Sequence, residues 1–286
     1  MLLPGLVCLI VFHYMPMYGV LIAFKDFKFL KGIWGSDWVG FDHFVKLFSG
    51  LDFTNVLRNT IVISVLKLIC GAPAPILLAL LLNEVRNSGY KRIVQTLSYL
   101  PHFFSWVVLG GIIGMVFSTQ GPVNMILGMF GLKEPLGFYS DGGLFLGLLI
   151  GTAVWQSVGW SAVIYIATLS GIDETLYEAA CIDGAGRFKQ AIYISLPSLL
   201  PTFITVQLLN LGNILNAGFD QVYNMFNTTV YDVADIIDTY ALRKLQTMDY
   251  GLGAAVGLFK SAIGLALVLS FNKLVKSLSG GEMGIL

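Results

Sequence analysis

Long apolar runs separated by short polar segments dominate the chain. A membrane-crossing helix needs about 20 mostly apolar residues, and six stretches meet that requirement: residues 2–24, 60–82, 97–117, 144–166, 198–217 and 251–271. No segment between them is long and apolar enough to build a separate soluble domain. The pattern therefore predicts an all-α membrane protein, with six transmembrane helices in a single domain over residues 1–286.

Two shorter segments predict helices outside these spans. Phe41, Phe44, Val45 and Phe48 follow the i, i+3, i+4, i+7 spacing of one helix face, which is typical of a short helix at the membrane interface. Residues 122–132 are apolar but too short to cross, so we expect a helix on the membrane surface.

Composition agrees with a bilayer environment. Charged residues make up 12% of the 286 residues and hydrophobic residues 56%, whereas an ordinary soluble domain carries about 25% charged residues. A solvated surface needs charge, nucleic-acid binding needs a basic excess and disorder needs low hydrophobicity. With 17 basic and 17 acidic residues, the chain is not expected to bind nucleic acid.

The charged residues alone do not orient the protein in the membrane. The three segments on one side, including the C-terminal tail, carry seven Lys and Arg residues, and the opposite side carries eight. The positive-inside tendency therefore favours neither side. Before Phe24 there is no basic region and no small-residue cleavage site, so we expect the first apolar run to be a retained span.

The polar segment 171–197 predicts a rigid helical hairpin. Asp173 can cap a short helix that reaches Ile182, and Gly184 can adopt the positive φ that ends it. A second helix over residues 187–195 then leads to the fifth span. Small residues near the bend would let the surface of another protein approach closely, and a helix seated in a groove is a recurrent mode of recognition.

This hairpin resembles the EAA loop of binding-protein-dependent ABC importer permeases. The matching residues are Glu178, Ala179, Ala180, Asp183, Gly184 and Ala185, followed by Phe188, Ile192, Leu196 and Pro197. Segments 15–19, 23–26, 38–41, 80–86 and 99–103 resemble carbohydrate-uptake permeases, so the likeness covers nearly the whole chain. It is greatest to the branch that imports oligosaccharides released from complex polysaccharides, often containing uronates.

The resemblance implies a type I ABC importer permease fold in the bacterial cytoplasmic (inner) membrane, with both termini cytoplasmic. Segment 171–197 would be the cytoplasmic coupling loop, and Glu178, Ala179, Ala180, Asp183, Gly184 and Ala185 would contact an ATP-binding subunit. The implied partners are a second homologous permease subunit, two ATP-binding subunits, an extracellular or periplasmic sugar-binding protein and membrane lipid. The chain itself would have no catalytic residues and no cofactor, because ATP and Mg would be bound by the partner subunits. Such permeases usually begin with a basic stretch, and its absence before Leu2 suggests an N-terminally shortened chain.

Polar side chains within the spans are candidates for a solute path. Gln207, Asn210, Asn213 and Asn216 lie three residues apart along the fifth span, and Trp155, Gln156, Trp160 and Tyr165 lie in the fourth. Amides match sugar hydroxyls and aromatic faces stack on sugar rings. The alternative is ordinary hydrogen bonding between helices, at about 0.6 kcal/mol per contact.

Lys67 and Lys260 are the only charged residues in the six spans. A lysine at the centre of a span costs about 2.5–3.5 kcal/mol on insertion scales. Either these lysines line the path and favour an anionic sugar, or they reach the headgroups or pair with an acidic residue of a loop.

Other classes of protein fit the sequence less well. A secondary transporter would need an intramembrane carboxylate for ion coupling, and the six spans contain no Asp or Glu. No phosphate-binding loop, metal-ligand spacing or nucleophile–base arrangement is recognisable, so an enzyme is not expected. An ABC importer for a non-sugar solute remains open, because the coupling loop is shared across substrates.

Overall fold

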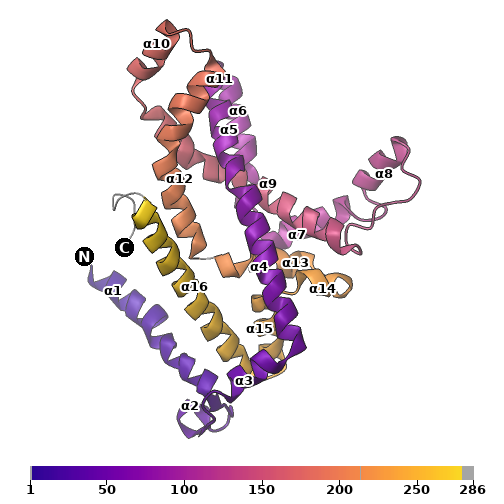
Figure 1. The fold of residues 1–286 in the computed structure, drawn as a ribbon. Helices are drawn as coiled ribbons and strands as arrows, with labels where there is room; N and C mark the ends of the chain where they lie inside the picture. Colours follow the sequence, from indigo (N-terminus) through magenta and orange to yellow (C-terminus); the bar gives the residue numbers. More distant parts are fainter. Residues whose placement is uncertain (1, 213, 279–286) are drawn as a thin grey trace.

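The computed structural model describes residues 2–212 and 214–278, which form an elongated bundle of helices (Figure 1). Among these residues, five helices are long and apolar enough to cross a membrane, and one bent pair of helices would supply a sixth. The five are Leu3–Phe24, Asp52–Glu84, Gly142–Ser170, Arg187–Leu211 and Tyr250–Ser277. Asn213, one of the predicted path residues, lies outside the described residues.

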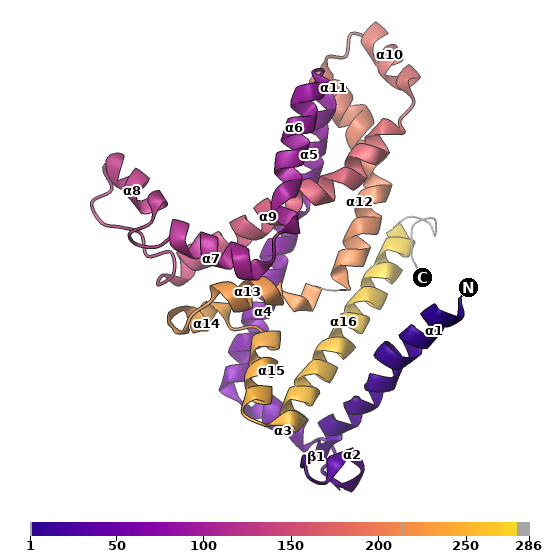
Figure 2. The same cartoon turned by 180° about the vertical axis from the view of Figure 1, so that it is seen from behind.

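The first and last spans pack against each other along one side of the molecule (Figure 2). The first comprises α1 (Leu3–Leu9), a π-helical turn and a tighter 3₁₀ segment that ends at Phe24. It contacts α16 (Tyr250–Leu278). The first span buries only Ala23, so nearly its whole apolar surface is left for lipid or another subunit.

Short elements close one end of the bundle. Strands β1 (Lys25–Asp26) and β2 (Asp37–Trp38) pair antiparallel around α2 (Gly32–Gly35). The predicted interfacial helix is present as α3 (Asp42–Ser49). It packs inward through two buried residues, His43 and Leu47, and leaves the predicted apolar face largely outward, where a bilayer surface would cover it.

The second and fourth spans form the centre of the bundle. Helices α4 (Leu51–Gly71) and α5 (Pro73–Glu84) follow one another and make up the second span. Both contact the 29-residue helix α9 (Gly142–Ser170). Asp141 caps the start of α9, because its carboxylate accepts a hydrogen bond from Leu144 N at 2.8 Å.

The prediction of one helix over 97–117 is wrong. Helix α6 (Ser88–Tyr99) and its 3₁₀ extension to Phe103 meet α7 (Trp106–Val116) at a bend of 105°. Pro101 lies in the 3₁₀ segment, and proline supplies no N–H donor to continue a helix. Ser105 then starts α7, because its hydroxyl accepts from Val108 N at 3.4 Å.

The short helix predicted after this region is present as α8 (Pro122–Met129), and it projects from the side of the bundle (Figure 1). Its one buried residue is Asn124. The Asn124 amide donates to the carbonyls of Ser118 and Leu136, and its oxygen accepts from Leu136 N at 2.8 Å. This amide therefore fixes the loop on both sides of α8.

The predicted fifth span, 198–217, ends earlier than expected. Helix α11 (Arg187–Gln190), a π-helical turn and α12 (Leu196–Leu211) form a continuous helix of 25 residues. The chain then makes a 3₁₀ turn, Ile214–Asn216, and reverses through positive φ values of 47° at Ala217 and 75° at Gly218. Positive φ is incompatible with continuing a right-handed helix.

Beyond this corner the chain forms a group of short elements before the last span. These are α13 (Phe219–Met225), a 3₁₀ turn at Thr228–Val230, α14 (Tyr231–Ala234) and α15 (Ile237–Gln246). A buried carboxylate anchors them, since Asp235 accepts from Arg243 Nη2 at 2.6 Å and from Thr239 Oγ1 at 2.8 Å.

Three apolar clusters hold the helices together. The first joins α4, α7, α9, α13 and α14, the second joins α3, α4, α15 and α16, and the third joins α5, α9 and α12. Helices α4 and α9 each contribute to two of these clusters, so they lie at the centre of the fold. The all-α membrane fold expected from the sequence is confirmed.

Candidate functional site

A helical hairpin stands at the end of the bundle opposite to α2 and α3 (Figures 1 and 2). Its first helix is α10 (Glu174–Ile182), and the Asp173 carboxylate accepts from Thr175 N at 2.9 Å to begin it. This backbone hydrogen bond lowers the pKa of Asp173. The cap is therefore fully formed at neutral pH and is lost only as the pH falls through that lowered pKa.

The turn of the hairpin is fixed by backbone hydrogen bonds. Gly184 has a φ of +74°, its N–H donates to Cys181 O at 3.1 Å, and Ala185 N donates to Ala180 O at 2.8 Å. Together these two bonds form a Schellman motif, which stops α10 and sets the direction of the next helix. The predicted cap, stop and second helix are all present.

Polar contacts attach the hairpin to the spans. Tyr177 on α10 and Ser195 at the start of the fifth span share a hydrogen bond of 2.8 Å between their hydroxyls. Arg187 forms an ion pair of 3.5 Å with Glu84 at the end of the second span. Tyr177 thus connects α10 to the fifth span, and Arg187 connects α11 to the second.

The six residues predicted to contact an ATP-binding subunit lie together on this hairpin. Glu178, Ala179, Asp183 and Gly184 are exposed, whereas Ala180 and Ala185 are half-buried at the bend. Among the described residues, neither acid takes part in an ion pair. The structure leaves this surface available to a partner.

Two exposed apolar side chains of the hairpin, Ile182 and Phe188, were not among the six predicted contact residues, although Phe188 belongs to the EAA-like pattern. Ile182 is 87% exposed and Phe188 is 79% exposed. Exposed apolar groups on a short polar hairpin mark an interaction surface. Ile182 could have been predicted to be exposed, because it lies next to the Asp183–Gly184 turn in a segment with too few apolar residues to form a core.

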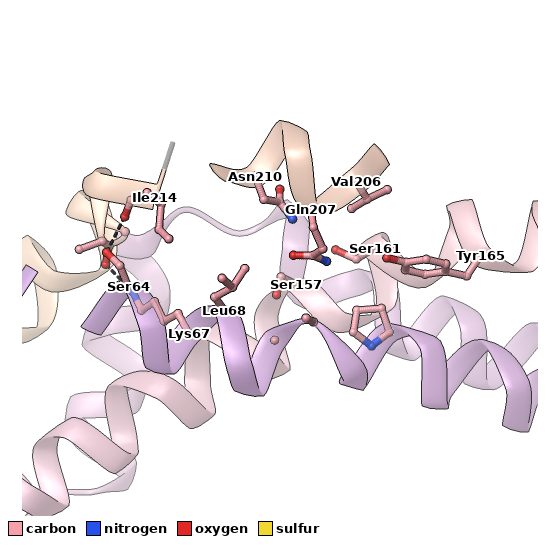
Figure 3. A pocket seen from close by; sticks show the side chains of 15 residues that line it. Ser64, Lys67, Leu68, Ser157, Ser161, Tyr165, Val206, Gln207, Asn210 and Ile214 are labelled. Carbon is pink, nitrogen blue, oxygen red and sulfur yellow. Dashed lines mark hydrogen bonds between the residues drawn. The ribbon is translucent and has the colours of Figure 1, made fainter. Parts of the chain in front are cut away.

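A polar cavity of about 280 Å³ lies between the second, fourth and fifth spans (Figure 3). Its polar lining comes from α4, α9 and α12: Ser64, Lys67, Ser157, Ser161, Tyr165, Gln207 and Asn210. Ser64 and Lys67 lie at one end and Tyr165 at the other. A row of hydroxyl, amide and ammonium groups inside a membrane bundle can replace the water around a polar solute.

Gln207 is the strongest indication that the cavity receives a ligand. Its side chain is 9% exposed, and its amide oxygen has no hydrogen-bond partner among the described residues. An unsatisfied buried acceptor costs about 1–3 kcal/mol. A hydroxyl group of a solute in the cavity would satisfy it.

Four predicted path residues line this cavity: Lys67, Tyr165, Gln207 and Asn210. The fifth-span stripe does not reach Asn216 as a helical face, because α12 ends at Leu211. Asn216 instead lines a second cavity of about 560 Å³ with Trp106 and Asp238.

The remaining predicted path residues lie elsewhere. Lys260 donates to both carboxylate oxygens of Asp238 at 2.7 Å, so the loop-pairing alternative is correct for this lysine. Trp155 lines an apolar cavity between α7 and α9. Trp160 stacks on His102 with ring centroids 4.9 Å apart, and Gln156 Nε2 is 3.5 Å from His102 O. These contacts are packing between spans.

The serines of the cavity were not among the predicted path residues, whereas Tyr165 was. Ser157, Ser161 and Tyr165 are spaced four apart and line the cavity from one face of α9. This four-residue spacing is the feature of the sequence that could have predicted a polar face on this helix. It is weak because a serine in an apolar helix can bond its own backbone, as Ser157 does with Ala153 O at 2.8 Å.

Neither the hairpin nor the polar cavity resembles a metal-binding site in the described part of the chain. Within residues 2–212 and 214–278, no group of three His, Cys, Asp or Glu residues could hold a metal ion. A membrane bundle with a polar cavity between its spans and a rigid hairpin outside them has the architecture of a transport permease.

The chain belongs to the family described as binding-protein-dependent transport system inner membrane component, whose sequence profile matches residues 71–280. Over 279 residues it is 43% identical to Protein LplB of Bacillus subtilis, covering 96% of this chain and 87% of that protein. It is 42% identical to the polygalacturonan/rhamnogalacturonan transport system permease protein YteP of the same species, covering 100% of this chain and 88% of that protein.

Solved structures agree with this family. The chain is similar to a bacterial ABC transporter involved in the import of the acidic polysaccharide alginate, with a TM-score of 0.90 and 37% identity, covering 97% of this chain and 94% of that one. It is also similar to the alginate transporter in complex with an alginate pentasaccharide-bound periplasmic protein, with a TM-score of 0.90 and 36% identity, covering 100% and 95%. The resemblance to ABC importer permeases seen in the sequence is confirmed.

Proposed function

We propose that this chain is the permease subunit of an ATP-driven importer of acidic oligosaccharides. The observation that carries the proposal is the α10–α11 hairpin, a capped and rigid surface outside the spans that is tied by Tyr177 and Arg187 to two of them. Such a surface suits a partner that delivers mechanical work. The named transport substrates of similar proteins, polygalacturonan, rhamnogalacturonan and alginate, support the substrate class.

The proposed assembly contains a second homologous permease, two ATP-binding subunits and an extracellular or periplasmic sugar-binding protein. The chain itself would catalyse no reaction and bind no cofactor, since ATP and Mg would reside on the ATP-binding subunits. Glu178 and Asp183 would make the polar contacts to one of those subunits, and Gly184 would shape the turn. Ala179, Ala180 and Ala185 would allow close approach.

The proposed mechanism is alternating access in the bacterial inner membrane. The hairpin and both termini would face the cytoplasm, and the end with α2 and α3 would face the binding protein. ATP and the loaded binding protein must both bind the outward-facing state more tightly than the inward-facing one, because otherwise neither would shift the equilibrium. The polar cavity would then hold part of the oligosaccharide as it passes.

The test is transport by the complete complex in proteoliposomes. Purified binding protein is loaded separately with trigalacturonate, an alginate trisaccharide, maltotriose and galactotriose, and ATP-dependent uptake of each is measured. We expect uptake of at least one acidic trisaccharide that requires both ATP and the binding protein. Uptake confined to the neutral sugars would overturn the substrate class, and uptake independent of ATP would overturn the importer.

A further inference from the structure

Lys67 places a single charged group at the edge of the polar cavity. It projects from α4 toward the corner at Ala217 and Gly218, where the fifth span has ended (Figure 3). The other polar residues of the lining are serines, amides and a tyrosine, all uncharged at neutral pH. The cavity therefore carries one sign of charge.

The ammonium group is held by neutral acceptors only. Lys67 Nζ donates to Ala217 O at 2.8 Å and to Gln221 Oε1 at 2.5 Å, and among the described residues it takes part in no ion pair. A lysine ammonium has three N–H donors. These two bonds use two of them, so the ammonium can donate one more hydrogen bond.

Gln221 fixes the position of this charge. It is 1% exposed, and its amide nitrogen donates to Leu149 O at 2.7 Å and to Thr152 Oγ1 at 2.8 Å. These bonds to α9 leave the amide oxygen directed at Lys67. The ammonium is thus preorganised between the second span, the fourth span and the corner after the fifth.

The second lysine within a span shows the contrast. Lys260 is neutralised by Asp238 and does not line the polar cavity. Of the two in-span cations, only Lys67 lacks a counter-ion within the described part of the chain. An anionic solute would supply one.

We propose that Lys67 selects for charge in the translocation path, binding a sugar carboxylate as the oligosaccharide passes through the cavity. The inference rests on the proposed importer function and names the residue that recognises the acidic class. The carboxylate takes the remaining N–H of the ammonium, while Gln207 and Asn210, from the facing span, bond hydroxyl groups of the same sugar. A compact ammonium suits this role because it holds a charge without demanding the planar geometry of a guanidinium.

Lys67 also bonds the corner at Ala217, so its removal could act through structure alone. The test separates the two effects by measuring two rates on the same complete, reconstituted transporter. One is uptake of trigalacturonate or the alginate trisaccharide, whichever the wild type transports faster. The other is ATP hydrolysis stimulated by the loaded binding protein.

The variants are Lys67→Met, Lys67→Gln and Lys67→Arg. Met removes the charge, Gln removes the charge but keeps N–H donors, and Arg keeps the charge. Lys273→Met is the matched control, because Lys273 is an exposed lysine on α16 that does not line the cavity. It removes one positive charge from the chain without changing the path.

We expect Lys67→Met and Lys67→Gln to lower acidic uptake at least tenfold while stimulated ATP hydrolysis stays within about threefold of the wild type. Lys67→Arg should retain most uptake, and Lys273→Met should resemble the wild type. The proposal is overturned if Lys67→Met keeps uptake within twofold, or if both rates fall in parallel, which would indicate a structural role. A wild type that transports neither acidic sugar would instead count against the proposed substrate class.

Discussion

Gly184 and Gly186 lie two residues apart in the hairpin but have opposite backbone requirements. Both are exposed, and a Cβ atom added to either would meet nothing within 4 Å. They differ in φ, which is +74° at Gly184 and −70° at Gly186. If the same substitution has different effects at Gly184 and Gly186, the cause is therefore the backbone conformation and not steric crowding of the new side chain.

We expect Gly184→Ala to weaken coupling and Gly186→Ala to be nearly silent. An L-residue in the left-handed region costs roughly 1–2 kcal/mol, which is enough to shift the hairpin away from its Schellman turn. The measurement is ATP hydrolysis stimulated by the loaded binding protein. Equal rates for both variants would argue that the turn geometry does not matter for contact with the ATP-binding subunit.

At the scale of the element, α9 is the helix on which the other spans are assembled. Its glycines have different surroundings: a Cβ on Gly159 would overlap the backbone carbonyl of Ser98 and lie 2.8 Å from Tyr99 N, whereas one on Gly147 would meet nothing within 4 Å. The end of α6 thus packs backbone to backbone on α9, just before the chain bends at Phe104. Close approach at Gly159 is what allows the bent third segment to lie against the bundle.

Gly159→Ala should therefore destabilise the permease, and Gly147→Ala should not. Forcing extra volume into a packed contact costs typically about 1–3 kcal/mol, because a backbone cannot rotate away as a side chain can. At an open helical position alanine is favoured over glycine by up to about 1 kcal/mol. Thermal unfolding of the detergent-solubilised complex measures both, and a Gly159→Ala midpoint equal to that of the wild type would contradict the packing argument.

At the scale of the whole molecule, the two ends of the bundle are chemically distinct. One end carries the α10–α11 hairpin, and the start of α1 and the end of α16 lie on the same side as it (Figures 1 and 2). The other end carries α2, the two-stranded sheet and α3. Charge counts did not distinguish these ends, so the orientation needs a direct measurement.

The native Cys181 provides that measurement, since it is exposed on α10. With the other two cysteines, Cys8 and Cys70, replaced by serine, a membrane-impermeant maleimide should label Cys181 only in inside-out vesicles washed with urea to strip peripheral subunits. A Lys31→Cys reporter at the opposite end, in a cysteine-free chain, should label only in right-side-out vesicles. The reverse pattern would place the hairpin outside the cell and refute the proposed topology.

The sequence predicted the hairpin in detail and the path only in part. Capping by Asp173 and the glycine stop are local effects, because they depend on residues within one or two turns, and the structure has both. The bend at 104–105 was missed because a hydropathy window averages over Pro101 and Ser105. The prediction that the polar face of the fifth span continues to Asn216 was wrong. The helix ends before that residue, and the corner at Ala217 is held by Lys67 and other groups that are distant in sequence. Pairing of Lys260 with Asp238 is likewise a tertiary contact, and spacing alone could offer it only as one of two alternatives.

The unbroken helix from Arg187 to Leu211 has a mechanical consequence. Gln207 lies 20 positions after Arg187, so at 1.5 Å per residue about 30 Å of helix separates the hairpin from the cavity, and a tilt of about 10° would move one end by about 5 Å. The π-helical turn at Ala191–Ser195, which Tyr177 contacts through Ser195, and Pro201 within α12 both interrupt the regular hydrogen bonding of this helix between the hairpin and Gln207. A movement imposed on the hairpin would therefore reach the cavity through two positions at which the helix can bend.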